Sequence, residues 1–174
     1  FFSQKGPGAM HAPWLISLAA GLVVGGLSQF SRLCTVGGFR DLFLFKKSIL
    51  IFGYLAVLVG VFLVNISFGN FHLGFENQPI AHTDGLWNFL GMALAGFCSV
   101  LLGGCPLRQL IMTGEGNSDS AVTVLGLAAG AAFAHNFGLA ASGAGPTLNG
   151  EIAVVVGFIV ALIIAVVNTK RANA

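Results

Sequence analysis

Two cysteines lie in short segments that resemble each other and could bind an anion. The segments are CTVGG at residues 34–38 and GGCPLR at residues 103–108. A residue before proline avoids the helical region, and proline suits the first position of a helix, so Cys105 is expected at the N-cap of a short helix that begins at Pro106. Free N–H groups and the helix dipole at such an end favour an anion or a thiolate. Cys34 is expected to form a second site of this kind.

The same cysteines also have a purely structural interpretation. A free cysteine is often a small buried hydrophobe, and neighbouring glycines often serve close packing. Cys98, seven residues before Cys105 and so expected on a similar helix face, is adequately explained by packing. The three cysteines form no CxxC pair and no Cys/His ligand spacing. We therefore expect no disulfide scaffold, no metal site and no cofactor.

The composition predicts an integral membrane protein. Of the 174 residues, 56% are hydrophobic and only 8% are charged, whereas about 25% are charged in an average soluble domain. Mean hydropathy is +0.89. A formal charge of +2, without a basic run or a stacking platform, predicts no nucleic-acid partner. GxSxG, Walker A and HExxH motifs do not occur, so we do not expect an enzyme.

Five stretches are long and apolar enough to cross a bilayer as helices, which requires about 20 residues. They cover residues 13–31, 48–68, 86–104, 119–138 and 151–168. Asp84 and Ser118 are the predicted N-caps of the third and fourth. The expected fold is an all-α polytopic membrane protein, with one transmembrane domain over residues 1–174.

Residues 32–47 and 103–117 are too short to cross and too apolar for ordinary loops, so we expect re-entrant half-helices. Each segment has a cysteine with a glycine nine residues before it and an Arg-polar-Leu triplet after it, at offsets that differ by three residues. This weak repeat predicts two span–hairpin–span units, at about 13–68 and 86–138, followed by a final span at 151–168.

The basic residues predict the orientation in the membrane. Loops 69–84 and 139–150 contain no Lys or Arg, whereas the opposite ends of the spans carry Lys46, Lys47, Arg108, Lys170 and Arg171. By the positive-inside rule, both loops lie outside, the C-terminus is cytoplasmic, and both cysteine hairpins enter from inside. Lys5 is the discordant residue. With five crossings, a second copy joined in series would be inverted, a common plan of transporters.

Several polar residues are expected within or near the membrane, where ionisable groups are costly and usually functional. Arg40, Asp41 and Arg108 either attract an anion or cap helix ends at the interface. His135 and Asn136 suit an interhelical hydrogen bond as well as a substrate role. The candidate pathway residues are Cys34, Gly37, Arg40, Gly104, Cys105, Pro106, Arg108 and Gln109, with His135, Asn136 and Cys98 as further candidates.

Three segments together resemble the YeeE/YedE family of bacterial membrane proteins, closest to the branch linked to selenium metabolism. They read SRLCTVGGFRDL, AHTDGLWNFLGMALAG and GGCPLRQLIMTGEGNSDSAVTVLG, and the resemblance extends over residues 9–167. It implies an inner-membrane protein that takes up thiosulfate and related compounds, an hourglass of inverted repeats, and central thiols that hand the anion inward. It places Cys34 and Cys105 on the pathway, whereas Cys98 matches no family motif.

Family members are usually about twice as long, and this chain resembles their C-terminal half. The resemblance thus implies a second resembling half, a homodimer or a longer parent protein. We expect a transporter for a small sulfur or selenium anion, such as thiosulfate or selenite. One alternative is a partner that passes a persulfide or selenopersulfide from Cys34 or Cys105 to a soluble sulfur carrier. Another is a structural half of a split transporter. The lipid bilayer is a partner in each case.

Overall fold

The computed structural model describes residues 12–74 and 82–172, which form helices and connecting loops without a β-strand. Lys5 lies outside these residues. The all-α prediction is confirmed. The helices of the described part are α1 (Trp14–Ser31), α2 (Thr35–Phe45), α3 (Ile49–Ser67), α4 (Gly85–Leu101), α5 (Pro106–Gly114), α6 (Ser118–Asn136) and α7 (Leu148–Ala172).

Four helical stretches of the described part are long and apolar enough to cross a membrane. They are Trp14–Phe45, Ile49–Ser67, Gly85–Gly114 and Leu148–Lys170. Helix α6 coincides with the predicted fourth span but is not among them, because polar residues stand at both its ends and alanine and glycine fill its middle. The first and third stretches each include a short helix, α2 or α5, after a break in the chain. Insertion of these short helices into a membrane stays a prediction.

Local backbone geometry explains both breaks. Helix α1 ends at Arg32, whose φ of 50° is left-handed, and Cys34 is extended before α2 begins. Helix α4 ends before Gly103, whose φ of 73° suits glycine. Cys105 is then extended, with φ −70° and ψ 161°, and Pro106 takes the first position of α5. The predicted N-cap position of Cys105 is therefore confirmed.

The predicted caps of the long helices are half right. The Asp84 carboxylate accepts a hydrogen bond from the Trp87 N–H at 3.3 Å and caps α4, as predicted. The prediction of Ser118 was wrong, because Asn117 is the N-cap of α6 and accepts from the Ser120 N–H at 2.9 Å. The carboxamide one residue earlier reaches this donor, so Ser118 becomes the first residue of the helix.

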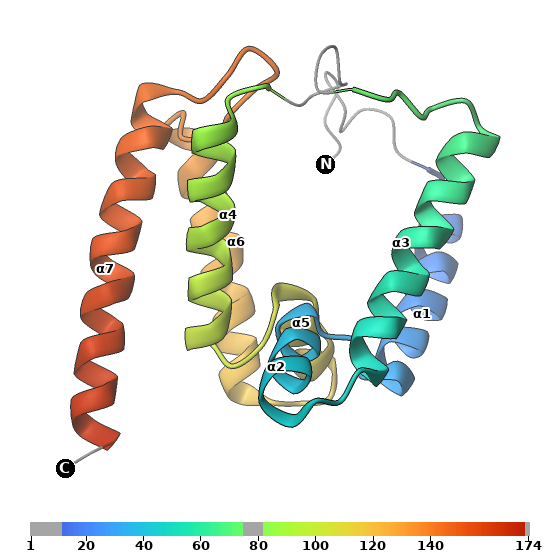
Figure 1. Ribbon diagram of the computed structural model, residues 1–174, viewed down its shortest axis with the longest axis horizontal. Helices are drawn as coiled ribbons and strands as arrows, with labels where there is room; N and C mark the ends of the chain where they lie inside the picture. Colours follow the sequence, from blue (N-terminus) through green and yellow to red (C-terminus); the bar gives the residue numbers. More distant parts are fainter. Residues whose placement is uncertain (1–11, 75–81, 173–174) are drawn as a thin grey trace.

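Two three-helix units share the order long, short, long (Figure 1). The first unit is α1–α3 and the second unit is α4–α6. Each short helix packs on the following long helix of its own unit, α2 on α3 and α5 on α6. Each also contacts the first long helix of the other unit, since α5 contacts α1 and α2 contacts α4. Helix α7 packs on α4. The short helices are thus the elements that join the two units.

The interior of the described part is small and polar rather than apolar. Its buried side chains are Ser28, Ser99, Cys105, Gln109, Ser120 and Ala161. Large apolar side chains point outward along the long helices, as lipid contact requires. The accessible surface is 13243 Å², whereas a compact chain of this mass exposes about 8,000 Å². This surplus of accessible surface carries many large apolar side chains, which have to be covered by lipid or by further protein.

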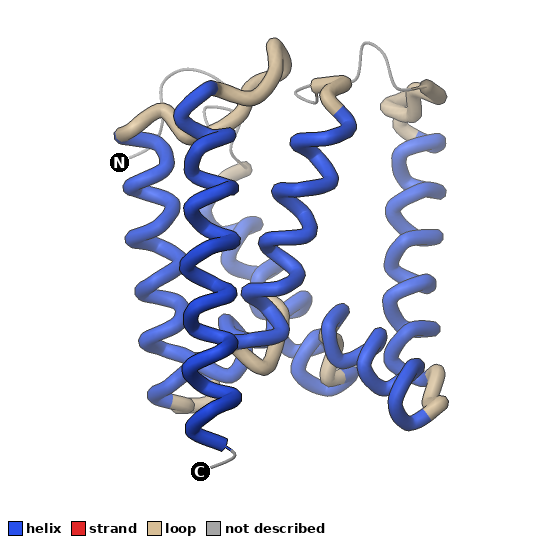
Figure 2. Tube along the Cα trace, turned by 60° about the vertical axis from the view of Figure 1, so that its left-hand side comes forward, coloured by secondary structure: helices blue, strands red, loops and turns tan. Residues whose placement is uncertain are grey.

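The loops after α3, before α4 and after α6 lie at one end of the molecule, and the short helices lie at the other (Figures 1 and 2). Residues 68–74, 82–84 and 137–147 occupy one end, and α2, α5 and the last turn of α7 occupy the other. The Lys and Arg residues of the described part lie at the short-helix end: Arg32, Arg40, Lys46, Lys47, Arg108, Lys170 and Arg171. This distribution is the one from which a cytoplasmic short-helix end was predicted, and that orientation stays a prediction.

Candidate functional site

Cys34 and Cys105 come from different units and meet where the two short helices begin. The Cys34 thiol lies within interaction range of the Cys105 sulfur. Cys105 is only 6% exposed, and Cys34 is partly buried. Neither is part of a disulfide. Two segments that are 71 positions apart in the sequence thus form one paired-thiol centre.

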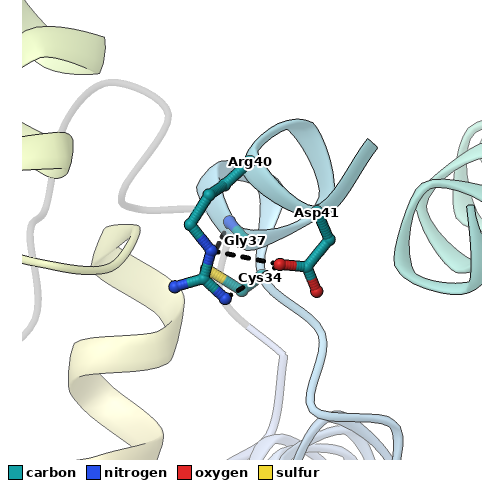
Figure 3. Close-up of polar contacts among 4 residues, drawn as sticks. All are labelled: Cys34, Gly37, Arg40 and Asp41. Atoms are coloured by element: carbon teal, nitrogen blue, oxygen red, sulfur yellow. Dashed lines mark hydrogen bonds and ion pairs between the residues drawn. The ribbon is translucent and has the colours of Figure 1, made fainter. Parts of the chain in front are cut away.

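Backbone N–H groups from both short helices face this centre. The Gly37 N–H donates to Cys34 Sγ at 3.3 Å, which is an N-cap interaction within α2 (Figure 3). Cys105 lacks a cap bond of that geometry. Its sulfur lies within interaction range of the Arg108 N–H of its own helix, and of the N–H and the hydroxyl of Thr35 in α2. Such donors stabilise negative charge on sulfur or on an anion beside it.

Gln109 and Gly104 hold the turn that carries Cys105. The Gln109 side chain is 5% exposed, and its Nε2 donates to the Leu102 carbonyl oxygen at 2.9 Å. A Cβ added to Gly104 would lie 3.5 Å from Gln109 Nε2, at ordinary contact distance, so the Gln109 carboxamide packs beside this glycine. Gln109 was predicted as a pathway residue, and its observed contact is with the turn before α5.

The two candidate arginines differ in their surroundings. Arg108 is the third residue of α5, and its Nη1 donates to Gln29 Oε1 at 3.1 Å. Arg40 is the sixth residue of α2, and its Nη2 lies 2.9 Å from Asp41 Oδ1 (Figure 3). The Arg40 side chain is 58% exposed. When α2 and α5 are aligned on their cysteine N-caps, the two arginines occupy different positions in their helices. This difference is the three-residue offset in the sequence repeat.

The structure does not bring His135 and Asn136 to the paired thiols. Both are exposed at the C-terminal end of α6, and Asn136 Nδ2 donates to the Ala132 carbonyl oxygen within that helix. Helix α6 starts at the short-helix end and has 19 residues, which corresponds to about 28 Å of helix. Both residues thus lie at the loop end of the molecule.

Cys98 faces a different region from Cys105. It lines an apolar groove of about 1020 Å³ together with residues of α6 and α7, including Phe133, Val156 and Ala161, and Cys105 is not part of that lining. The expectation of a similar face was wrong, because α4 ends at Leu101 and the chain turns through Gly103. A spacing of seven residues defines a common face only within one continuous helix.

Thr35 and Gln29 are two contact residues that the sequence interpretation missed. Thr35 occupies the first position of α2, where the second unit has Pro106, so only Thr35 offers an N–H and a hydroxyl there. Gln29 is a polar residue inside an apolar stretch, and this was the available signal. Within the described ranges, no three His, Cys, Asp or Glu side chains gather where they could hold a metal ion.

Comparison with known proteins adds one finding to this geometry. A family model described as sulphur transport matches residues 30–173, which include both units' short helices and both cysteines of the centre. Searches of curated proteins and of solved structures give no match. Because the family match extends over most of the chain, this protein belongs to the sulphur transport family, the YeeE/YedE family of membrane proteins.

Proposed function

We propose that this membrane protein carries a small sulfur anion of the thiosulfate type past the thiols of Cys34 and Cys105. The observation that carries the proposal is the meeting of these thiols with N–H groups from the starts of both α2 and α5. The family match supports transport of a sulfur compound. The choice of anion and the role of the thiols are inferred from the chemistry of the centre.

Thiosulfate suits such a centre because it presents two kinds of acceptor. Its terminal sulfur can accept a hydrogen bond from a thiol, and its oxygens can accept from backbone N–H groups and from the Thr35 hydroxyl. No covalent step is required, because one thiol can release the anion as the other engages it. Selenite offers oxygens but no terminal sulfur. Closest resemblance to the selenium-linked branch therefore stays a prediction. Competition between selenite and thiosulfate for uptake tests it.

A persulfide relay to a soluble carrier is a weaker proposal for this centre. Such a relay needs a thiol that another protein can reach. Cys105 is 6% exposed and lies against Thr35 and Cys34. Because Cys105 is buried, a small anion can reach its thiol more readily than a docking protein can.

The proposed setting is the bacterial inner membrane, with the short-helix end and the C-terminus in the cytoplasm. Basic residues gather at that end, as the positive-inside rule requires. We also propose that a second resembling half covers part of the exposed apolar surface. The support for this is the surplus of accessible area and the complete lack of buried residues in α3.

Uptake of radiolabelled thiosulfate by cells that express the full-length protein tests this function. We expect saturable accumulation above that of cells with an empty vector, and competition by unlabelled thiosulfate. If unlabelled selenite competes as strongly as unlabelled thiosulfate, the result would favour a selenium anion as a substrate. Accumulation no higher than in the vector control, with the protein present in the membrane, would contradict the proposal. A persulfide found by mass spectrometry at either cysteine would instead support the relay.

Replacing Thr35 with Val removes the hydroxyl that faces Cys105 while keeping side-chain volume and the backbone N–H. The bound thiosulfate anion would lose the hydrogen bond from this hydroxyl, so we expect the apparent KM for thiosulfate to rise about tenfold. Thr35→Ser keeps the hydroxyl and should stay close to the wild-type value. Equal KM values for the Val and Ser variants, at matched protein levels, would mean that the hydroxyl plays no part.

A further inference from the structure

The Arg108 side chain joins the two units close to the paired thiols. Its Nη1 donates to Gln29 Oε1 of α1 at 3.1 Å, across 79 positions of sequence. Its Nη2 lies 3.8 Å from Glu115 Oε2 at the C-cap of α5. The Arg108 side chain is 21% exposed. The guanidinium is therefore held between a neutral acceptor of the first unit and a carboxylate of its own helix.

Each end of this link is rigidly connected to one of the cysteines. Gln29 stands five residues before Cys34, and the turn between them is closed by Arg32 N–H to Gln29 O at 3.2 Å and Leu33 N–H to Ser28 O at 3.1 Å. Arg108 stands three residues after Cys105 in the first turn of α5. The link between Gln29 and Arg108 thus ties together two short rigid segments, each of which ends in a thiol.

We propose that Gln29 is a positioning residue for the transport centre: by holding Arg108, it sets the spacing between the Cys34 and Cys105 sulfurs. The claim that this spacing serves anion binding rests on the proposed function. The claim that Gln29 sets the spacing does not. Arg108 then acts through geometry, because Gln29 and Glu115 already engage its guanidinium. This differs from the role of a free cation that attracts the substrate.

The residue types suit such a link. A guanidinium has five N–H donors in a planar fork and can bind two acceptors in different directions, whereas a lysine ammonium is a flexible point charge. Gln29 supplies an uncharged acceptor in the last turn of an apolar helix, where a carboxylate would be more costly to bury. Glu115 balances the charge of Arg108 near the exposed end of α5.

The rate of disulfide formation between Cys34 and Cys105 measures the spacing directly. The experiment uses the full-length protein with Cys98→Ala, which removes the third thiol, and diamide as the two-electron oxidant. Mass spectrometry of non-reduced peptides reports the linked pair. We expect Gln29→Ala to slow its formation about tenfold, because the hydrogen bond to the guanidinium is lost. Gln29→Glu keeps an acceptor and should restore the rate.

Ser31→Ala is the matched control, because the Ser31 hydroxyl also lies in the last turn of α1 but bonds within it, to Ser28 O. This variant should oxidise at the wild-type rate. Arg108→Gln cuts the link from the other side and serves if Gln29→Ala does not fold. Wild-type oxidation rates in both Gln29→Ala and Arg108→Gln would overturn the proposal. Oxidation is measured without substrate, so a failure of thiosulfate uptake counts against the proposed function alone.

Discussion

Uptake of thiosulfate falls about 100-fold when Cys105 is replaced by Ala, if the paired-thiol centre carries the anion. The size follows from removing one preorganised group at a buried charge-binding site, which typically has this effect on a rate. Cys105 is the more buried of the two thiols and faces donors from both short helices. Initial rates of radiolabelled uptake, normalised to the amount of membrane-inserted protein, measure the effect.

Cys98→Ala is the control for this prediction. Cys98 lines the groove beside α6 and α7, whose lining includes neither Cys34 nor Cys105. The uptake rate of this variant should therefore stay within about twofold of wild type, as is usual for a substitution outside the functional centre. Cys34→Ala should lower uptake as Cys105→Ala does, because the anion would lose one of its two thiol partners. Full uptake in both the Cys34 and the Cys105 variant would exclude the thiols from transport.

Replacing Gly150 with Ala is expected to lower stability strongly without touching the paired thiols. An added Cβ would lie 2.5 Å from the Leu139 carbonyl oxygen and 3.0 Å from Thr147 Oγ1. Thr147 Oγ1 donates to the Gly138 carbonyl oxygen at 2.7 Å and accepts from the Gly150 N–H at 3.0 Å. The loop before α7 is therefore packed backbone to backbone, and overpacking there should cost about 2 kcal/mol or more.

Thermal unfolding in detergent measures this loss, with two glycine variants for comparison. In Gly157→Ala the three nearest atoms to the added Cβ belong to the Leu94 side chain, with its Cδ2 methyl at 2.7 Å, and a rotamer change can move this methyl, so a smaller loss is expected. Gly130→Ala meets nothing within 4 Å and should be neutral or slightly stabilising, because alanine is the better helix former. Equal melting temperatures for Gly150→Ala and Gly130→Ala would contradict the described packing of this loop.

Helix positions could be predicted closely from the sequence because their signals are local. Apolar length marked the long helices, and the proline after Cys105 marked the start of α5. Local signals also limited the accuracy. Ser118 and Asn117 are adjacent capping residues, and the choice between them depends on which side chain reaches the Ser120 N–H.

The candidate site was predictable in its members but not in its contacts. The two cysteine segments were singled out by their resemblance to each other, yet nothing in either segment shows that their sulfurs meet. That meeting depends on the exchange of contacts between the units, α1 with α5 and α4 with α2. Thr35 and Gln29 were missed for the same reason, because their partners lie in the other unit.

Equilibrium binding of radiolabelled thiosulfate to the purified full-length protein is the most direct test of the paired-thiol centre. The account predicts saturable binding to the wild-type protein and to the Cys98→Ala variant. It predicts loss of that binding in Cys34→Ala and in Cys105→Ala, with all four proteins showing the same melting behaviour. Thiosulfate binding of wild-type strength in both the Cys34→Ala and the Cys105→Ala proteins would contradict the account.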